Sequence, residues 1–381
     1  MYNRLISNEL RSCKKSILLL GPRQVGKSTL IESLNPDLRI NLANESEYFS
    51  FQSNLNELER RIGASAPRTV FIDEIQRIPR LTNTIQDLVD HNKQLKFYLT
   101  GSSARKLKRG RANLLPGRLI SFSLAPLSFL ELGSDFDIEH AMSFGFLPEV
   151  QTLQSIKEKK QLLMSYANQY LKEEILAEAL VRSVDGFVRF LREAAVDSGK
   201  FLDFSKIARK SKIPRQSGVR HFEILVDTMI AHRSENDPDF DSIDLVRHPK
   251  FFFFDLGVLN AILGSFQVSK DREGLLFEHF IFNQLFNTGT ALNLDFEIYN
   301  FRTRGGLEID FMLKRDNKRF AIECKSSDSV SSSELNSLRS LDQYKIKCEK
   351  LVIYRGKREL KDDKIWILPI AKAFEVMGFK K

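Results

Sequence analysis

The sequence predicts an α/β fold built around a parallel sheet, and three apolar runs carry this prediction. The runs cover residues 17–20, 69–72 and 95–99. Short apolar runs of this kind are typical of strands that are buried on both faces of a sheet. A loop with glycine at each end follows the first run, two carboxylates follow the second, and a Thr-Gly turn follows the third. Because parallel strands end at the same edge of a sheet, we expect these polar groups to meet there.

The loop after the first run matches the phosphate-binding pattern G-x-x-x-x-G-K-[ST], between a strand and a helix as that motif requires. Gly21 and Gly26 allow backbone angles closed to other residues, so that main-chain N–H groups can approach a phosphate. We expect Lys27 to contact the β- and γ-phosphates of ATP and the Ser28 hydroxyl to ligate Mg²⁺. The alternative is a chance glycine turn before a helix. The nucleotide-binding residues expected from the motif are Gly21, Pro22, Arg23, Gln24, Val25, Gly26, Lys27, Ser28 and Thr29.

The polar residues after the other two runs fit the same site. We expect Asp73 in the coordination shell of Mg²⁺, and Glu74 to polarise the water that attacks the γ-phosphate. An acidic pair at a strand end is a weak signal alone, but it is a strong one about 45 residues after a phosphate-binding loop. Thr100 is expected to act as a sensor that hydrogen-bonds the water or the γ-phosphate. The alternative for Thr100 is an ordinary turn.

Arg118 comes directly before another predicted strand, residues 119–124. Ring-forming ATPases present an arginine at this place to the γ-phosphate of the neighbouring subunit, where it stabilises charge in the transition state. We therefore expect a homo-oligomer, with a hexameric ring and Arg118 acting in trans as one form of it. A plain surface arginine is the alternative.

Composition and charge narrow the class of protein. The chain has 381 residues, 42% of them apolar and 28% charged, which indicates a soluble protein with two or three domains. No apolar run approaches the roughly 20 residues that span a bilayer. The three cysteines show no metal-ligand spacing, so we expect a cytoplasmic protein without disulfides.

The net charge of +9 is unevenly distributed. Residues 105–118 and 206–220 each carry six basic side chains and no acidic one. Such clusters favour binding to a nucleic acid, and we expect that partner to be DNA. The alternative is that the clusters are ordinary solvated surfaces.

Five short stretches are similar to those of a large prokaryotic family: residues 21–29, 71–76, 99–103, 116–118 and 126–131. Its members combine an N-terminal AAA+-type ATPase with a C-terminal domain of unknown function that resembles the PD-(D/E)XK nucleases. The similarity extends over most of the chain. It implies a P-loop AAA+ core with a helical lid and a C-terminal restriction-endonuclease-like α/β domain, but it says little about physiology.

The segments between these motifs suggest how the chain is divided. Residues 145–149 resemble the turn between core and lid in that family, and residues 151–184 have apolar positions at helical spacing without Pro or Gly. The expected division is a P-loop AAA+ core over 1–135, a helical lid over 136–198, a helix-turn-helix or winged-helix-like segment over 199–247, and a nuclease-like domain over 248–381.

The third segment has the pattern of a helix-turn-helix. Residues 204–210 and 215–227 are expected to be helices joined by a short turn, and the second helix of such a unit enters the major groove. The expected DNA-binding residues are Arg209, Lys210, Arg215 and Arg220. The alternative is a helical hairpin used only for packing.

The C-terminal segment brings a second group of polar residues. Glu278 lies on an expected helix, Asp310 on an expected strand, and Glu323 and Lys325 on one face of the next strand. Carboxylates that hold Mg²⁺ and a lysine beside its bound water would suit phosphodiester cleavage. The order Glu, Asp, Glu-x-Lys resembles the PD-(D/E)XK core. Since a fold does not settle function, a domain that binds without cutting is the alternative.

These expectations combine into three hypotheses of function. The first is an ATP-binding and ATP-hydrolysing protein that acts on DNA, with a C-terminal domain that cleaves or grips DNA in a metal-dependent manner. The second is an ATP-gated switch that binds DNA or a protein through a catalytically silent nuclease-like domain. A sequence-reading regulator based on the basic helices is a third.

Overall fold

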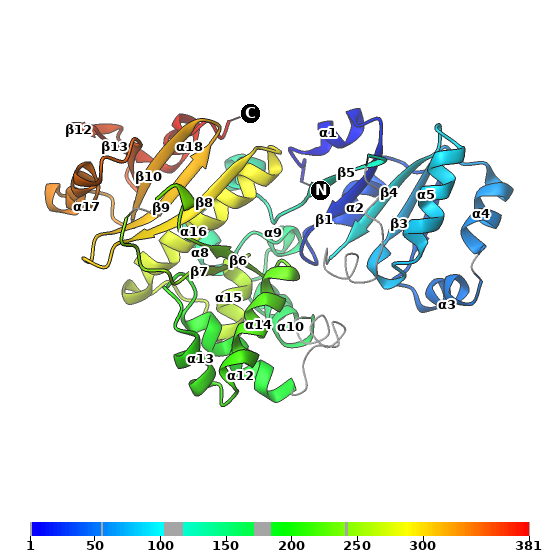
Figure 1. Ribbon diagram of the computed structural model, residues 1–381, viewed down its shortest axis with the longest axis horizontal. Helices are drawn as coiled ribbons and strands as arrows, with labels where there is room; N and C mark the ends of the chain where they lie inside the picture. Colours follow the sequence, from blue (N-terminus) through cyan, green and yellow to red (C-terminus); the bar gives the residue numbers. More distant parts are fainter. Residues whose placement is uncertain (1, 55, 103–116, 171–183, 241–242, 381) are drawn as a thin grey trace.

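The computed structural model describes residues 2–380 except 55, 103–116, 171–183 and 241–242. Two β-sheets lie at opposite ends of the view in Figure 1, and a group of helices lies below and between them. Within the described residues, no helix is long and apolar enough to cross a membrane.

The first sheet is parallel, with five strands in the order β2-β3-β4-β1-β5. Its strands are β1 (Ser16–Leu20), β2 (Leu38–Asn41), β3 (Thr69–Asp73), β4 (Lys96–Gly101) and β5 (Leu119–Ser123). The three apolar runs of the sequence form β1, β3 and β4 in the middle of the sheet, which confirms the predicted parallel sheet.

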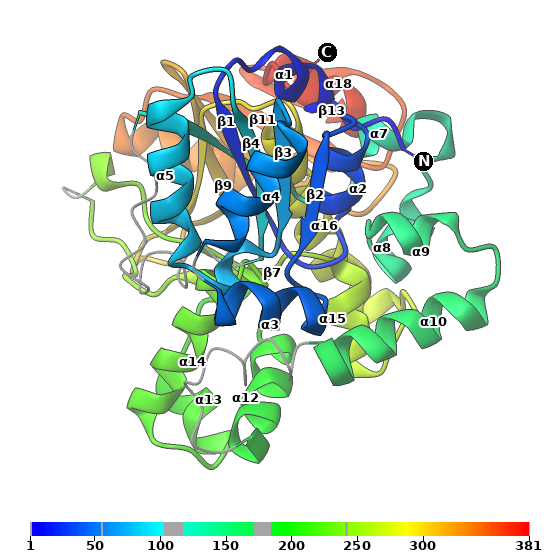
Figure 2. The same ribbon diagram turned by 90° about the vertical axis from the view of Figure 1, so that its right-hand side faces the viewer.

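Helices cover both faces of this sheet (Figures 1 and 2). They are α1 (Ser7–Ser12), α2 (Lys27–Glu32), α3 (Glu45–Ser53), α4 (Glu57–Ser65) and α5 (Leu81–His91). Alternate residues of the central strands enter different clusters: Ile17 and Leu19 pack with α1 and α2, whereas Leu18 packs with α3, α4 and α5. This double burial explains why these strands are apolar without alternation.

The middle of the chain is mostly helical. Its elements are α7 (Phe129–Leu132), α8 (Ile138–Phe144), α9 (Pro148–Thr152), α10 (Ile156–Ser165), α12 (Val184–Val196), α13 (Phe204–Lys210), α14 (Arg215–Asp227), β6 (Ala231–Ser234), β7 (Lys250–Phe253) and α15 (Leu256–Leu263). Helices α13 and α14 have the predicted bounds. The described part of the segment expected to be helical from residue 151 is mostly helical but divided, because α9 ends at Thr152 and Ser155 caps α10 by accepting from the Glu158 N–H at 3.4 Å.

The second sheet is mixed, with six strands in the order β12-β13-β11-β10-β9-β8. Its strands are β8 (Phe296–Arg302), β9 (Glu308–Arg315), β10 (Lys318–Lys325), β11 (Glu349–Tyr354), β12 (Leu360–Asp362) and β13 (Ile365–Pro369). The C-terminal helices are α16 (Lys270–Ala291), α17 (Asn336–Ser340) and α18 (Ile370–Val376). The largest apolar cluster runs from α1 through α16 to α18, so it reaches both sheets.

Two glycines allow the end of α8 to lie directly against the start of α15. Asp255 is buried there, and its carboxylate accepts from the main-chain N–H groups of Phe146 at 2.5 Å and Val258 at 3.0 Å. Burial raises the pKa of this carboxyl to about 6. A Cβ on Gly145 would overlap the Asp255 carboxylate, and a Cβ on Gly257 would overlap the carbonyl of residue 144. Close backbone approach therefore requires glycine at both positions.

Replacing Gly257 by alanine should lower stability by about 1–3 kcal/mol, because the added methyl group overlaps a main-chain carbonyl in a packed junction. Gly63→Ala is the matched control, since Gly63 is also helical and a Cβ there meets nothing within 4 Å. That variant should gain about 0.5–1 kcal/mol from reduced freedom of the unfolded chain. Urea unfolding of both variants measures the difference, and equal midpoints would contradict this account of the junction.

Candidate functional site

The candidate site lies at the carboxyl edge of the first sheet. The register aligns Leu20 at the end of β1 with Gly101 at the end of β4, and Ile72 of β3 with Leu99 of β4. The three strands therefore end side by side, and residues at or just after their ends converge. This is the edge at which open α/β sheets bind ligands.

Asp73 is the meeting point of three elements. Its carboxylate accepts hydrogen bonds from the Ser28 hydroxyl at 2.8 and 2.9 Å, and from the Thr100 hydroxyl. The Thr100 oxygen in turn accepts from the Glu74 main-chain N–H at 3.2 Å. The structure thus brings together Ser28, Asp73, Glu74 and Thr100. Because the side chains of Ser28 and Asp73 offer only oxygen donors, they fit a hard cation such as Mg²⁺.

The glycine-bounded loop wraps around the amine of Lys27. Gly26 has a φ of +91°, and a Cβ on Gly21 would overlap the carbonyl of residue 124, so each glycine has its own steric reason. The Lys27 side chain is buried, and its Nζ donates to the carbonyls of Gly21 at 2.9 Å and Pro22 at 2.8 Å. Helix α2 begins at Lys27, so its first N–H groups open into the same loop.

Glu74 is held by side chains that the sequence analysis did not identify. Its φ of +58° places it in the left-handed region, a conformation that costs a residue with a side chain about 1–3 kcal/mol. Its carboxylate accepts from the amide of Gln76 and from the Ser102 hydroxyl at 3.4 Å. The Gln76 amide also donates to Ser102 at 3.0 Å, and Gln76 is buried. The only signal in the sequence was a glutamine two residues after the acidic pair.

Arg4 fixes the back of the loop, and it was also missed. Its guanidinium is buried and donates to the carbonyls of Val25 and Ala125, both at 2.7 Å. Its Nε donates to the Glu131 carboxylate at 3.0 Å, which also accepts from the Leu5 N–H at 2.9 Å. Arg4 therefore ties the loop to the chain that leaves β5. These partners lie more than 100 residues away in sequence except Val25, so no local pattern could reveal them.

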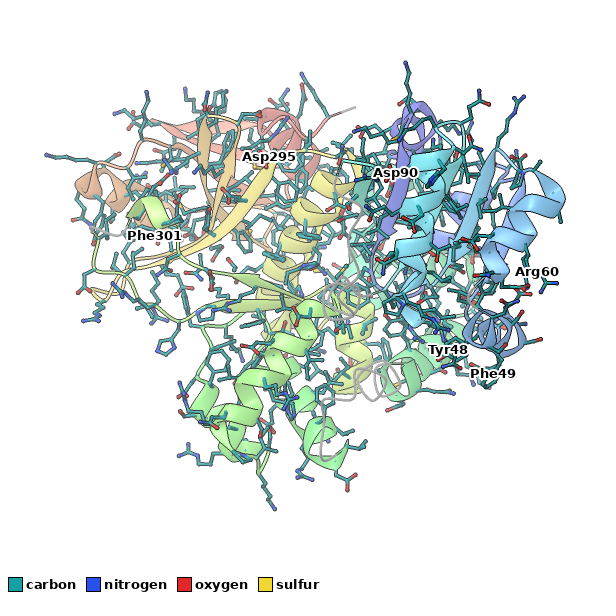
Figure 3. All side chains as sticks on the ribbon, turned by 45° about the vertical axis from the view of Figure 1, so that its right-hand side comes forward. Tyr48, Phe49, Arg60, Asp90, Asp295 and Phe301 are labelled. Carbon is teal, nitrogen blue, oxygen red and sulfur yellow. The ribbon has the colours of Figure 1, made fainter. Side chains whose placement is uncertain are left out.

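Arg118 lies at the opposite edge of the sheet from the loop of its own chain. Strands β1 and β5 are parallel with Ser16 opposite Leu119, so Arg118 precedes the amino end of β5. Five residues of strand extend roughly 16 Å. The Arg118 Nε donates to Asp90 at 2.7 Å. Asp90 lies on α5 and is labelled in Figure 3. Arg118 is thus separated from the loop of its own chain by the length of β5.

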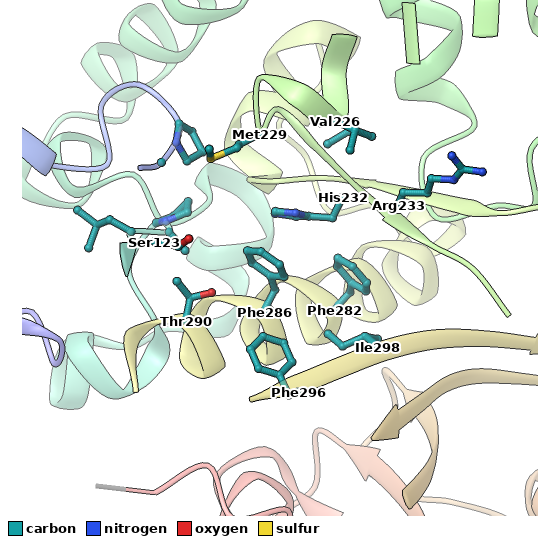
Figure 4. A pocket seen from close by; sticks show the side chains of 16 residues that line it. Ser123, Val226, Met229, His232, Arg233, Phe282, Phe286, Thr290, Phe296 and Ile298 are labelled. Carbon is teal, nitrogen blue, oxygen red and sulfur yellow. The ribbon is translucent and has the colours of Figure 1, made fainter. Parts of the chain in front are cut away.

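A mostly apolar cavity of about 430 Å³ adjoins the first two residues of the loop. Figure 4 shows aromatic side chains of β6, α16 and β8 facing one another across it. The rings of His232 and Phe286 lie 3.7 Å apart, and burial lowers the pKa of His232 to about 3, so its imidazole is neutral. The cavity thus lies between the loop residues Gly21 and Pro22 and the C-terminal part of the chain.

The expected DNA-binding residues are all exposed. Arg209 and Lys210 end α13, and Arg215 and Arg220 lie on α14. Lys210 forms an ion pair with Glu193 of α12 at 3.2 Å. Most of the other basic cluster lies outside the described residues, namely Arg105, Lys106, Lys108, Arg109 and Arg111.

The C-terminal polar residues also come together. Glu278 of α16, Asp310 of β9, and Glu323 and Lys325 of β10 interact electrostatically. Lys325 pairs with Glu323 at 3.1 Å, and Asp310 accepts from the main-chain N–H of Cys324 at 2.8 Å. Burial and the charge of Asp310 raise the pKa of Glu278 and of Glu323 to about 8.

A lysine that the sequence analysis passed over lies in the same cluster. The buried Lys250 contacts Glu278 at 3.2 Å and Glu308 at 3.0 Å. In the part of the chain that the structure describes, no group of three or more His, Cys, Asp or Glu side chains is placed to hold a metal ion. The Mg²⁺ ligation expected at this cluster stays a prediction.

The Arg4→Met variant should lose about 3–5 kcal/mol of stability, because it leaves the buried Glu131 carboxylate without its charged partner. Adding Glu131→Gln should recover part of the loss, since the double variant no longer buries an unpaired charge. Arg60→Met serves as control, because Arg60 is exposed and its partner Glu57 is 4.0 Å away. The midpoints of urea unfolding are compared among wild type, Arg4→Met, the double variant and Arg60→Met. Equal losses in the single and double variants would contradict a charge-based explanation.

Three family models match successive parts of the chain. An AAA domain matches residues 13–133, and two domains of unknown function, DUF8612 and DUF4143, match residues 135–269 and 273–373. An uncharacterized protein of Mycobacterium tuberculosis is 24% identical over 352 residues, covering 89% of this chain and 76% of the relative. An uncharacterized protein of Methanocaldococcus jannaschii is 23% identical and covers 84% of this chain and 76% of the relative.

Solved structures resemble the chain more distantly. A signal transduction ATPase with a tetratricopeptide repeat sensor from Pyrococcus horikoshii is 14% identical, covering 75% of this chain and 46% of its own length, with a TM-score of 0.24. DnaA from Aquifex aeolicus bound to AMPPCP is 12% identical, covering 58% of this chain and 84% of its own, also at 0.24. The parallel sheet and the AAA match together suggest nucleotide binding. The family matches support an AAA-type ATPase family with a C-terminal DUF4143 domain.

Proposed function

We propose that this chain binds ATP with Mg²⁺ at the loop of residues 21–28 and hydrolyses it. The observation that carries the proposal is the convergence of Ser28 and Thr100 on Asp73, beside the buried amine of Lys27. The main-chain N–H of Glu74 donates to Thr100 and so joins the same group. Phosphoryl transfer requires little covalent chemistry from the protein. It requires positioned charges around the phosphate and a positioned water, and these groups supply both.

Each residue has a role that follows from its contacts. The Lys27 amine exchanges the carbonyls of Gly21 and Pro22 for β- and γ-phosphate oxygens, while main-chain N–H groups of the loop and α2 bind the remaining oxygens. Ser28 and Asp73 would hold Mg²⁺, which when bound would supply charge that neutralises the phosphates. Thr100 keeps the Asp73 carboxylate oriented and senses the γ-phosphate.

Glu74 orients the attacking water and accepts its proton. For this task the carboxylate must lie at a defined place, and Gln76 and Ser102 both hold it by hydrogen bonds. Glu74 follows Asp73 directly, so the base and the cation site cannot drift apart. General bases of this kind contribute roughly 10²–10⁴-fold to a rate.

Purified wild type should release phosphate from ATP, whereas Lys27→Ala and Glu74→Gln should not. The two variants should differ in binding: Glu74→Gln retains a fluorescent ATP analogue, and Lys27→Ala loses it. Turnover in Glu74→Gln should fall by roughly 10²-fold or more, because the proton acceptor is gone while the phosphate contacts remain. Turnover that is unchanged in Glu74→Gln would remove Glu74 from this role.

A neighbouring subunit would complete the site through Arg118. In the same assay, Arg118→Ala and Glu74→Gln should each be inactive, and mixing them should restore part of the turnover. In a mixed oligomer, an Arg118→Ala subunit keeps an intact ATP site with Glu74. A neighbouring Glu74→Gln subunit can supply Arg118 to that site. Full activity of Arg118→Ala alone, or no recovery on mixing, would show that Arg118 only pairs with Asp90.

A second candidate function is DNA binding through α13 and α14, favoured by the exposure of all four basic side chains there. The variant Arg215→Ala/Arg220→Ala should weaken binding to duplex DNA and lower the slope of log K against log salt by about two, since each phosphate contact contributes about 0.9. Arg11→Ala/Lys14→Ala is the control, because it removes the same charge from exposed positions elsewhere. If the slope of log K against log salt is the same in both double variants, α13 and α14 do not contact DNA phosphates and serve only for packing.

A further inference from the structure

Lys250 begins β7 and is 2% exposed. It is followed by four buried phenylalanines, so its backbone is fixed inside the apolar core. Its ammonium lies 4.9 Å from the centre of the Phe201 ring. A lysine this deeply buried is unusual unless its charge is compensated.

The compensation comes from two carboxylates on different elements. Lys250 Nζ lies 3.2 Å from Glu278 Oε1 on α16 and 3.0 Å from Glu308 Oε1 on β9. Asp310 also acts on Lys250 electrostatically, and Glu308 lies two residues before it on the same face of β9. The ammonium therefore links α16 to β9 at their acidic residues.

The remaining carboxylates of the cluster have partners too. Glu323 is paired with Lys325, and Asp310 accepts from a main-chain N–H of β10. Mg²⁺ requires oxygen ligands at about 2.0–2.1 Å in near-octahedral geometry. The Lys250 ammonium already contacts Glu278, so it repels a second cation and occupies lone pairs of the Glu278 carboxylate. The donor set therefore does not fit a divalent metal.

We propose that Lys250 is the resident cation of this carboxylate cluster and occupies the place that a divalent metal would take. The ammonium holds Glu278 and Glu308 together, so α16 stays anchored to the second sheet without metal. A cluster filled in this way holds no metal ion with which to cut a phosphodiester. This inference does not depend on ATP hydrolysis.

Manganese titrations followed by electron paramagnetic resonance test the proposal. All proteins carry Asp73→Asn, which removes the oxygen site of the first sheet from the measurement. The parent should bind no Mn²⁺ at the cluster. Lys250→Met should gain a Mn²⁺ site whose affinity exceeds any residual Mn²⁺ binding by the parent at least roughly tenfold, because a cation-sized place lined by carboxylates is vacated. Lys325→Met is the matched control, which removes a lysine from the same cluster and should not open this place.

Folding is measured in parallel, because Lys250→Met leaves buried carboxylates unpaired. Its thermal midpoint should drop and should rise again with Mn²⁺, whereas Lys250→Met/Glu278→Gln should be more stable than the single variant and gain nothing from Mn²⁺. A Lys250→Met protein that Mn²⁺ neither binds nor stabilises would overturn the proposal. So would Mn²⁺ binding by the parent, or metal-dependent nicking of supercoiled DNA by wild type that disappears in Glu323→Gln.

Discussion

The site at the first sheet depends on the hydrogen bonds that Asp73 accepts from Ser28 and Thr100. These bonds join the start of α2 and the end of β4 to the end of β3. The parallel register brings the three ends to one edge, and the hydroxyl contacts set their final positions. A carboxylate that is oriented before a cation arrives needs no rearrangement when charge develops, which is the basis of electrostatic catalysis.

The loop is also supported from behind by parts of the chain far away in sequence. Arg4 joins Val25 of the loop to Ala125, and the segment after it is held by α16. Gln284 accepts from the Phe129 N–H at 2.7 Å, and Asn287 donates to the carbonyl of residue 127 at 3.2 Å. The same helix carries Glu278, which contacts Lys250. One helix therefore touches both the chain leaving the first sheet and the carboxylate cluster of the second.

The elements that the sequence predicts well are those with local signatures. The apolar runs of β1, β3 and β4, the glycine-bounded loop, and the helices α13 and α14 all follow from spacing and residue type. Gln76, Arg4 and Lys250 could not be predicted in this way, because their roles come from tertiary contacts. Lys250 in particular resembles an ordinary basic residue before an apolar strand, and its partners lie on α16 and β9.

The most direct test of the central claim is calorimetric titration of the full chain with ATP in the presence of Mg²⁺. The structure predicts saturable binding that weakens when EDTA removes the cation, because Ser28 and Asp73 then lose their shared ligand. It also predicts that binding is lost in Lys27→Ala, where the ammonium between the loop carbonyls is absent. Absence of saturable binding by the wild type, or equal binding by Lys27→Ala, would contradict a nucleotide site at this loop.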